Sequence, residues 1–175
     1  NVRRKEDADR LKKHLDSTNL PTEEQHVVII GGGLLGLELA AALKHKKVKT
    51  TIIQRASRLM ERQLDRISSK LLAEEVQLRD IQIYFDNEVS TVFETDNPNE
   101  IEIALKSGRI ITANAIVYTI GTIPNIEIAR ESGLACGRGV KVNQYLQTSN
   151  PDIFAIGEIA EFNNKLFGIT SAAEE

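Results

Sequence analysis

Residues 27–38 read V-V-I-I-G-G-G-L-L-G-L-E, and the expected architecture of the chain follows from this stretch. Its four β-branched residues predict a buried strand. A run of glycines comes next, and residues 34–46 continue as a helical sequence. Residues 48–54 predict a second strand. Because strand, glycine turn, helix and strand form a βαβ unit, we expect a right-handed crossover and two parallel strands.

The glycines have the spacing G-x-G-x-x-G at the predicted strand-to-helix turn, with Gly31, Gly33 and Gly36 in the three places. In this motif the first glycine permits the tight turn, the second lets a pyrophosphate approach the backbone, and the third brings the helix against the strand. The helix N-terminus offers N–H groups and a positive dipole end to the phosphates. We therefore predict a dinucleotide site that includes Leu34 and Leu35. A turn used only for packing explains Gly36 but not three glycines at this spacing.

The composition limits the possible partners. A chain of 175 residues with 41% hydrophobic residues suits one domain, or one domain with partial elements of another. The net charge of −3 is dispersed, which argues against nucleic acid as a partner. We find no apolar run as long as a membrane span and no signal peptide. The single cysteine, Cys136, cannot form an internal disulfide, so we expect a cytoplasmic protein.

The rest of the sequence predicts an α/β fold. Residues 65–79 predict a helix whose buried face holds Leu64, Ile67, Leu71 and Leu78. Residues 4–15 predict a charged helix that packs or connects. The further predictions are a strand at 81–85, an antiparallel meander at 88–95, 100–106 and 109–112, a central buried strand at 115–120, a short helix at 125–131, and short strands at 140–142, 144–147 and 153–156, the last of them buried. We expect a Rossmann-like parallel sheet with helices on both faces and the meander covering one face.

Three patches, in this order, resemble one family. They are strand–GGGLLGLE–helix, T-I-G-T-I-P-N at 119–125 and T-S-N-P-D-I-F-A-I-G-E at 148–158. The first two resemble the NAD(P)H domain of FAD-dependent reductases of the pyridine nucleotide-disulfide oxidoreductase type, and the third looks like their second FAD motif. The resemblance implies that residues 23–147 form an NAD(P)H-binding domain. Residues 1–22 would be a linker helix from the FAD-binding domain, and residues 148–175 a partial return to that domain.

Two further stretches look like the large subunit of NAD(P)H-dependent nitrite reductases. They are L-M-E-R-Q-L-D at 59–65 and G-E-I-A-E-F-N-N-K-L-F-G at 157–168. Rubredoxin-reductase-like and NADH-oxidase-like flavoproteins are the alternatives. The resemblance implies hydride transfer from NAD(P)H to FAD and a role in nitrate assimilation. Electrons would pass on to a downstream siroheme and iron–sulfur domain or to a small electron carrier, and a homodimer is possible.

The ends of the sequence suggest a piece of a longer protein, because it begins without Met and ends on what looks like the start of a helix. The resemblance implies that the first FAD fingerprint lies upstream. We therefore expect this chain by itself to bind NAD(P)H weakly, to hold no FAD and to be inactive. The alternative is a regulatory NAD(P)-binding module without a redox role, against which the flavin motif argues.

The resemblance assigns four more residues to the cofactors. Glu38, two residues past the third glycine, would face the nicotinamide and accept a hydrogen bond from its carboxamide. It could equally be a solvated carboxylate in the first helical turn. Gly121 would approach the nicotinamide ribose. Gly157 and Glu158 would bind FAD, with the carboxylate on the ribityl chain.

Gln54 departs from the pattern of NAD-specific relatives, which place a carboxylate at the end of the second strand to hold the ribose 2′-OH. Arg55 follows it directly, and Arg58 and Arg62 are near in sequence. Because arginine can pair with a 2′-phosphate, we predict that NADPH binds at least as tightly as NADH. In the alternative, Arg55 only faces solvent.

No side chain is expected to act as a catalytic acid or base, because hydride transfer is the chemistry of the two cofactors. Cys136 lacks a neighbouring base and is expected to fill space. His14, His26 and His45 have no metal-ligand spacing, so no metal site is predicted.

Overall fold

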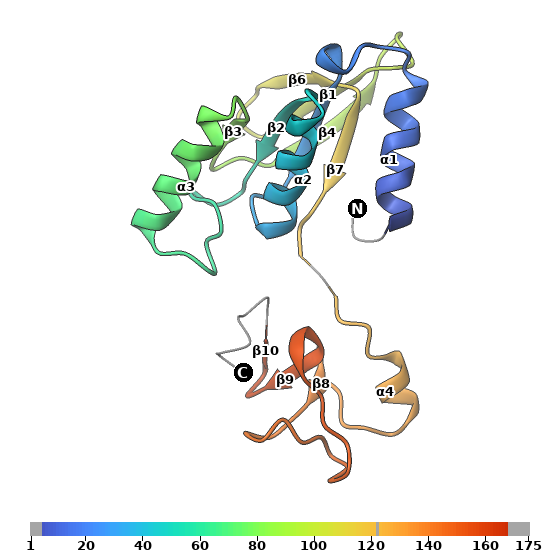
Figure 1. The fold of residues 1–175 in the computed structure, drawn as a ribbon, viewed down its shortest axis with the longest axis vertical. Coiled ribbons are helices and arrows are strands. Elements are labelled where there is room, and N and C mark those ends of the chain that lie inside the picture. Colours follow the sequence, from blue (N-terminus) through green and yellow to red (C-terminus); the bar gives the residue numbers. More distant parts are fainter. Residues whose placement is uncertain (1–4, 122, 168–175) are drawn as a thin grey trace. The chain divides into compact units, whose positions relative to one another are not determined.

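The computed structural model describes residues 5–121 and 123–167 (Figure 1). Contacts divide the chain into two compact units, Asn1–Ile120 and Gly121–Glu175, and each unit is described by itself. The domain limits expected from the resemblance remain a prediction. The last eight residues of the expected return segment lie outside the described part of the chain.

A parallel sheet, sheet A, forms the centre of the first unit and has the strand order β3-β2-β1-β7. Its strands are β1 (His26–Ile30), β2 (Lys49–Ile53), β3 (Gln82–Tyr84) and β7 (Ala115–Tyr118). All pairings are parallel, which confirms the predicted βαβ unit. Ile30 pairs with Ile53 on one side and with Tyr118 on the other, so β1, β2 and β7 end at the same level.

The predicted central strand at 115–120 is wrong in its position. Among the described residues β7 pairs only with β1, and it therefore lies at an edge of sheet A. Ala115 and Val117 are buried, whereas Tyr118 and Ile120 are exposed. Ala115 and Val117 pack in one core cluster and Ile116 packs against another, so the apolar run reflects packing on both faces and not a neighbouring strand on each side.

Helices cover one face of sheet A (Figure 1). They are α1 (Lys5–Ser17), α2 (Leu34–His45) and α3 (Arg66–Leu78), with a short 3₁₀ turn, η1 (Thr22–Glu24), between α1 and β1. Val27 and Ile29 of β1 belong to the same core cluster as side chains from all three helices. Alternate residues of β1 point to opposite faces, so Val28 belongs to a different cluster.

The predicted antiparallel meander is confirmed as sheet B, with the order β4-β5-β6. Its strands are β4 (Val89–Glu94), β5 (Ile101–Leu105) and β6 (Ile110–Ala113). Ile103 and Ile111 pack in one cluster with Val28 and Ile53 of sheet A. In the described structure, sheet B therefore covers the face on which we also expected helices, and the α/β class itself is confirmed.

The predicted buried face of α3 is wrong. Ile67, Leu71 and Leu78 are 76%, 61% and 83% exposed. The helix instead buries Ser69 and Val76. Leu72 and Ala73 pack against the core beside Val76, and on the same face the Ser69 hydroxyl donates a hydrogen bond of 2.7 Å to the Leu59 carbonyl.

The second unit contains α4 (Glu127–Glu131) and a small sheet of order β10-β9-β8. The strands are β8 (Val140–Lys141), β9 (Ala160–Phe162) and β10 (Lys165–Leu166), and η2 (Gly157–Ile159) precedes β9. The expected short helix at 125–131 and the strand at 140–142 are found in shortened form. None of the helices in the described ranges has the length and apolar character needed to cross a membrane.

Two predicted strands of this unit are wrong. Residues 144–147 form a turn, in which Asn143 Oδ1 accepts hydrogen bonds from the N–H groups of Tyr145 and Gln147. The segment 153–156 makes a single bridge, from Phe154 to Gln147, and Phe154 is exposed. An apolar segment is buried as a strand only where neighbouring strands cover it, and none of the described strands does so here.

Candidate dinucleotide-binding site

Three residues meet at the carboxyl edge of sheet A because each follows a strand that ends at the same level. Gly31 follows β1, Gln54 follows β2 and Thr119 follows β7. The chain continues from β1 to β2 on one side, whereas β7 lies on the other side. This is the topological switch point at which ligands bind in open α/β sheets.

Gly31 makes the turn that the motif requires. Its φ is +112°, a conformation that side chains strongly disfavour, and a β-carbon there would lie 3.1 Å from the Thr119 carbonyl oxygen. Its N–H donates to the Ile53 carbonyl at 2.9 Å and so extends the pairing with β2. Only glycine meets both conditions without strain.

Gly36 and Gly33 differ in what surrounds them. A β-carbon at Gly36 would lie 2.0 Å from the Gly31 carbonyl oxygen, so α2 touches the turn at this point. A β-carbon at Gly33 would meet no atom within 4 Å. Gly33 is the N-cap of α2, and Leu34 and Leu35 are the half-buried first residues of the helix. Backbone N–H groups at a helix start with open space in front of them can receive a phosphate.

Thr119 is a part of the site that sequence reasoning missed. It is buried, and its hydroxyl lies 3.0 Å from the Ile30 carbonyl oxygen and 3.1 Å from that of Gly31. Its N–H donates to the Ile30 carbonyl at 2.8 Å. The hydroxyl can donate to either carbonyl and thereby holds the end of β1 in place. Its place at the carboxyl end of the strand predicted at 115–120 was the available signal.

Gln54 directly follows β2 and contacts the glycine turn, and both ends of its amide are occupied. Its Oε1 accepts a hydrogen bond of 2.8 Å from the Gly32 N–H, and its Nε2 donates one of 3.1 Å to the Arg58 carbonyl. The side chain is buried. We call this pair of contacts the Gln54 bridge. The Met60 N–H also donates to the Gly32 carbonyl at 3.0 Å, so the loop after β2 is tied to the glycine turn.

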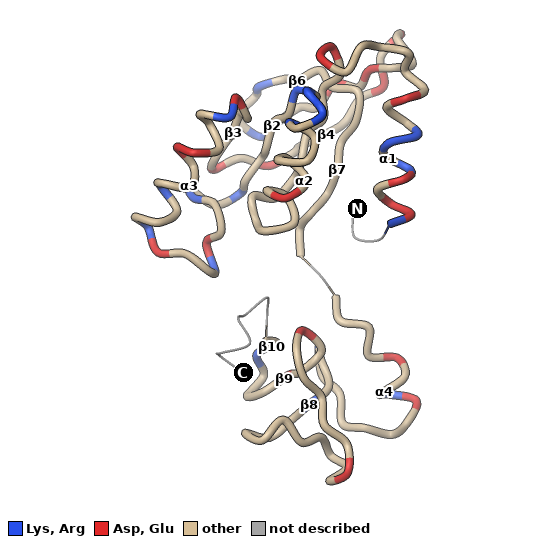
Figure 2. The backbone as a smooth tube through the Cα atoms, viewed as in Figure 1, with Lys and Arg blue, Asp and Glu red and all other residues tan. Residues whose placement is uncertain are grey.

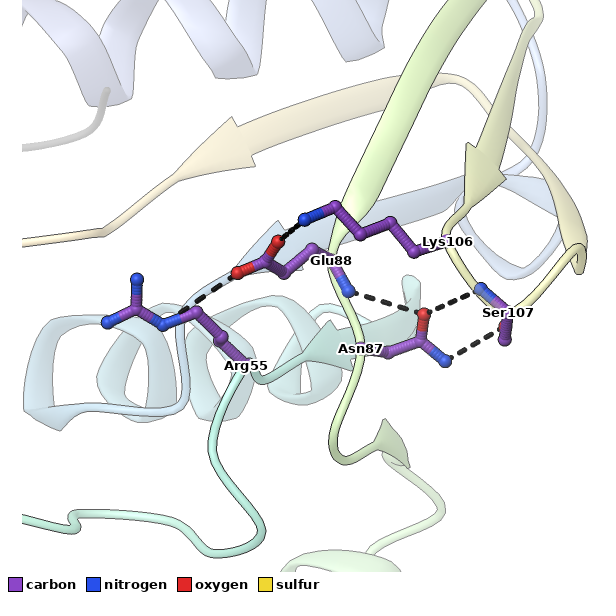
Figure 3. Close-up of polar contacts among 5 residues, drawn as sticks. All are labelled: Arg55, Asn87, Glu88, Lys106 and Ser107. Atoms are coloured by element: carbon purple, nitrogen blue, oxygen red, sulfur yellow. Dashed lines mark hydrogen bonds and ion pairs between the residues drawn. The ribbon is translucent and has the colours of Figure 1, made fainter.

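The three predicted arginines all lie on this loop, in which Figure 2 shows both basic and acidic positions. Arg58 is engaged with the loop itself, since its guanidinium donates to the Glu61 carbonyl at 2.9 Å. Arg62 is exposed. Arg55 is also exposed, but its Nε lies 3.8 Å from a Glu88 oxygen (Figure 3). The structure therefore places Glu88, which the sequence did not indicate, beside Arg55.

The Glu88 carboxylate has a second cationic neighbour. One of its oxygens is bonded to the Lys106 ammonium from the turn between β5 and β6, and the other faces Arg55 (Figure 3). The Lys106 hydrogen bond, together with the charges of Lys106 and Arg55, lowers the pKa of Glu88 below its ordinary value. Glu88 is therefore ionised at neutral pH and held between two cations.

The other predicted site residues are less constrained. Glu38 is exposed on the second turn of α2. Gly121, Gly157 and Glu158 all belong to the second unit, where Gly157 and Glu158 open η2. Their assignment to NAD(P)H and FAD stays a prediction.

The histidines and the cysteine have structural surroundings. The ring nitrogens of His26 lie 2.8 Å from the Thr112 carbonyl oxygen and 2.9 Å from the Thr51 hydroxyl. Burial lowers the His26 pKa, which favours the neutral ring. Cys136 is partly buried against the apolar cluster of the second unit. Within residues 5–121 and 123–167, no three His, Cys, Asp or Glu side chains gather where they could hold a metal ion.

Comparisons with known proteins identify relatives of this chain. The chain is 32% identical over 157 residues to the assimilatory nitrate reductase electron transfer subunit of Bacillus subtilis, and 34% identical over 160 residues to a nitrite reductase [NAD(P)H] of the same organism. Each alignment covers 90% of this chain and 20% of the relative, so the chain spans about a fifth of their length.

A solved ferredoxin reductase from Rhodopseudomonas palustris has the same fold. It superposes with a TM-score of 0.78 at 26% identity, over 97% of this chain and 41% of the other. The family described as pyridine nucleotide-disulphide oxidoreductase matches residues 1–175, and its reductases use NAD(P)H and FAD. With the glycine turn at the carboxyl edge of a parallel sheet, this match over the whole sequence shows that the chain belongs to the pyridine nucleotide-disulphide oxidoreductase family.

Proposed function

We propose that this chain is the NAD(P)H-binding part of an FAD-dependent reductase, in which hydride passes from NAD(P)H to FAD. The observation that supports this most is the glycine turn. Gly31 is held at φ +112° between Thr119 and the Gln54 bridge, and Gly33 is open at the start of α2. A pyrophosphate at Gly33 would meet backbone N–H groups and the positive end of the helix dipole.

The remaining roles are those that the family resemblance implies. Leu34 and Leu35 would line the first turn of α2 beside the pyrophosphate, and Glu38 would accept from the nicotinamide carboxamide. Arg55 and Arg62 would reach the 2′-phosphate of NADPH from the loop after β2. Gly121 would approach the nicotinamide ribose, and FAD would be held by Gly157 and Glu158 together with the rest of its own domain. No side chain has to move a proton, since the protein positions two cofactors that react with one another.

For the complete protein, we propose the electron-input part of a nitrite reductase large subunit. The supporting observation is the similarity to nitrite and nitrate reductase subunits over most of this chain. Electrons would leave FAD for a siroheme and iron–sulfur domain. A second candidate is a reductase that passes electrons to a small carrier protein, which the similarity to a ferredoxin reductase favours. In both cases the part of the protein described here would be the entry point for reducing equivalents.

Gly33→Asp tests the dinucleotide site without disturbing the fold. The new side chain would meet no atom within 4 Å of its β-carbon, but it would put a negative charge where the pyrophosphate is proposed to lie. We expect NADH and NADPH binding, measured by calorimetric titration, to be lost while the melting temperature stays unchanged. Gln77→Glu, which adds the same charge on an exposed position of α3, is the matched control. Unimpaired binding by Gly33→Asp would contradict the site.

The redox role needs the complete protein. We expect the full-length protein to purify with bound flavin and to lose the absorbance of oxidised flavin when NADH or NADPH is added without oxygen. The Gly33→Asp variant should keep its flavin but resist reduction. A colourless full-length protein that still binds NAD(P)H would support the regulatory module instead. Addition of nitrite or of a ferredoxin-type carrier would then distinguish the two proposed acceptors.

A further inference from the structure

We propose that Glu88 is a specificity-determining residue for the nicotinamide coenzyme. It engages Arg55 in an ion pair, weakens the hold of Arg55 on a 2′-phosphate and thereby keeps NADH and NADPH close in affinity. This inference rests on the proposed function, because it concerns NAD(P)H bound at the glycine turn. The sequence alone predicts only the opposite influence, that of an unopposed arginine after β2.

Gln54 places Arg55 and Glu88 beside one another. Arg55 follows Gln54 directly in the chain. The Asn87 N–H donates a hydrogen bond of 3.1 Å to the Gln54 carbonyl. Glu88 follows Asn87 directly, so it is held near Gln54 as well. Because the Gln54 amide oxygen also accepts from the Gly32 N–H, both charged residues lie next to the residue that contacts the glycine turn.

The Glu88 carboxylate is positioned by folded structure. Asn87 Oδ1 lies 3.4 Å from the Ser107 backbone nitrogen, which donates to it, and Asn87 Nδ2 donates to the Ser107 hydroxyl at 2.9 Å. Lys106, the residue before Ser107, bonds directly to the Glu88 carboxylate. The segment that carries Glu88 is thus tied to the turn between β5 and β6 (Figure 3). The Glu88 side chain is 34% exposed, compared with 80% for Arg55, so the carboxylate is the more fixed partner.

The charges of Arg55, Glu88 and Lys106 determine whether a 2′-phosphate is bound more tightly or more weakly. Arg55 and Lys106 contribute two positive charges and Glu88 one negative charge. A 2′-phosphate carries close to two negative charges at neutral pH, so it is attracted by the arginine and repelled by the carboxylate. A neutral ribose 2′-OH is affected far less by either charge. This chain has no carboxylate at the end of β2. Instead, the Glu88 carboxylate, from the segment before β4, lies beside Arg55.

The test compares the affinities of NADH and NADPH in Glu88→Gln and Lys106→Met by calorimetric titration. Glu88→Gln removes the repulsion and frees Arg55, so NADPH should bind about 2- to 5-fold more tightly and NADH about as before, as expected for a charge pair open to solvent. Lys106→Met leaves Glu88 less neutralised and should weaken NADPH binding. Both effects should shrink at high salt.

A double-mutant cycle assigns the effect to the Arg55 pair, because Glu88→Gln should change the ratio of the two affinities much less in an Arg55→Met background. Glu75→Gln, which removes the carboxylate that pairs with Arg79 on α3, is the matched control and should leave the ratio unchanged. If the wild type binds neither coenzyme, the proposed function fails. If it binds both and neither Glu88→Gln nor Lys106→Met changes the ratio, the role of Glu88 is refuted and the proposed function stands.

Discussion

Replacing Gln54 by leucine would remove both hydrogen bonds of the Gln54 bridge. The wild-type amide accepts from the Gly32 N–H at 2.8 Å and donates to the Arg58 carbonyl at 3.1 Å. The side chain is only 9% exposed, and leucine has a similar size. The substitution therefore keeps the packing approximately and takes away the polar partners. It tests how much the Gln54 bridge contributes to holding the loop after β2 against the glycine turn.

The expected loss of stability comes mainly from the Gly32 N–H. Gly32 is buried, and leaving a buried donor without a partner costs about 1–3 kcal/mol. Losing the bond to the Arg58 carbonyl adds about 0.5–1.5 kcal/mol. The total is about 1.5–4.5 kcal/mol, which is a large part of the roughly 5–15 kcal/mol that stabilises an ordinary domain.

Urea unfolding followed by circular dichroism measures this loss. Gln77→Leu, on an exposed position of α3, is the control and should change stability by less than about 0.5 kcal/mol. NAD(P)H affinity should fall in Gln54→Leu as well, because the glycine turn loses a support. A Gln54→Leu variant as stable as wild type would refute the reasoning, since water or another group would then satisfy the Gly32 N–H.

Gln54→Glu gives an independent check of the direction of each hydrogen bond. One carboxylate oxygen could still accept from Gly32, but the other would face the Arg58 carbonyl, which also only accepts. The folded state should therefore favour the protonated carboxyl, and its pKa should lie above the unfolded value. A group whose pKa is raised by folding makes the protein more stable as the pH falls. We expect this variant to approach wild-type stability at mildly acidic pH, and a stability difference independent of pH would contradict the assigned orientation.

Two further predictions concern His26 and Gly31. In the folded state, burial lowers the pKa of His26 below its ordinary value of 6.5. The contribution of His26 to stability is therefore complete above about pH 6.5, and it is lost as the pH falls below that value and the unfolded state takes up a proton. Urea unfolding at a series of pH values should show this loss in wild type and much less of it in His26→Gln. Gly31→Ala forces a side chain into φ +112° with its β-carbon 3.1 Å from the Thr119 carbonyl oxygen, which should cost about 1–3 kcal/mol and weaken NAD(P)H binding in titrations. Normal stability and binding in this variant would contradict the account of the turn.

Much of the first unit could be predicted from local patterns. The strand before the glycines, helix α2, strand β2 and the meander all have a periodicity or a motif that only one structure satisfies. Helix α3 was predicted at nearly its correct length, but its buried face was not. The face that meets the core instead holds Leu72, Ala73 and Val76, together with the hydrogen bond from Ser69 to the Leu59 carbonyl. Both faces carry apolar residues at helical spacing, so the spacing alone does not decide which of them meets the core.

The site likewise contains residues that a local motif specifies and residues that only the fold brings together. The glycine turn is encoded within a few residues, and its geometry agrees with the motif. Thr119 and Glu88 belong to the site because β7 lies beside β1 and because Asn87 bonds to Gln54. Strand order and hydrogen bonds between distant segments decide these neighbours. No pattern in one sequence specifies either, so an unopposed Arg55 was the natural expectation.

The apolar segments that were predicted wrongly have a common physical cause. β1 and the segment 153–156 are both rich in β-branched and apolar residues. β1 is buried because β2 and β7 pair with it and because both faces of sheet A are covered there. Ile156 has the same intrinsic preference but is 67% exposed, since no described strand pairs alongside it. The composition of a segment thus indicates that burial would stabilise it, but it does not indicate which other segment covers it.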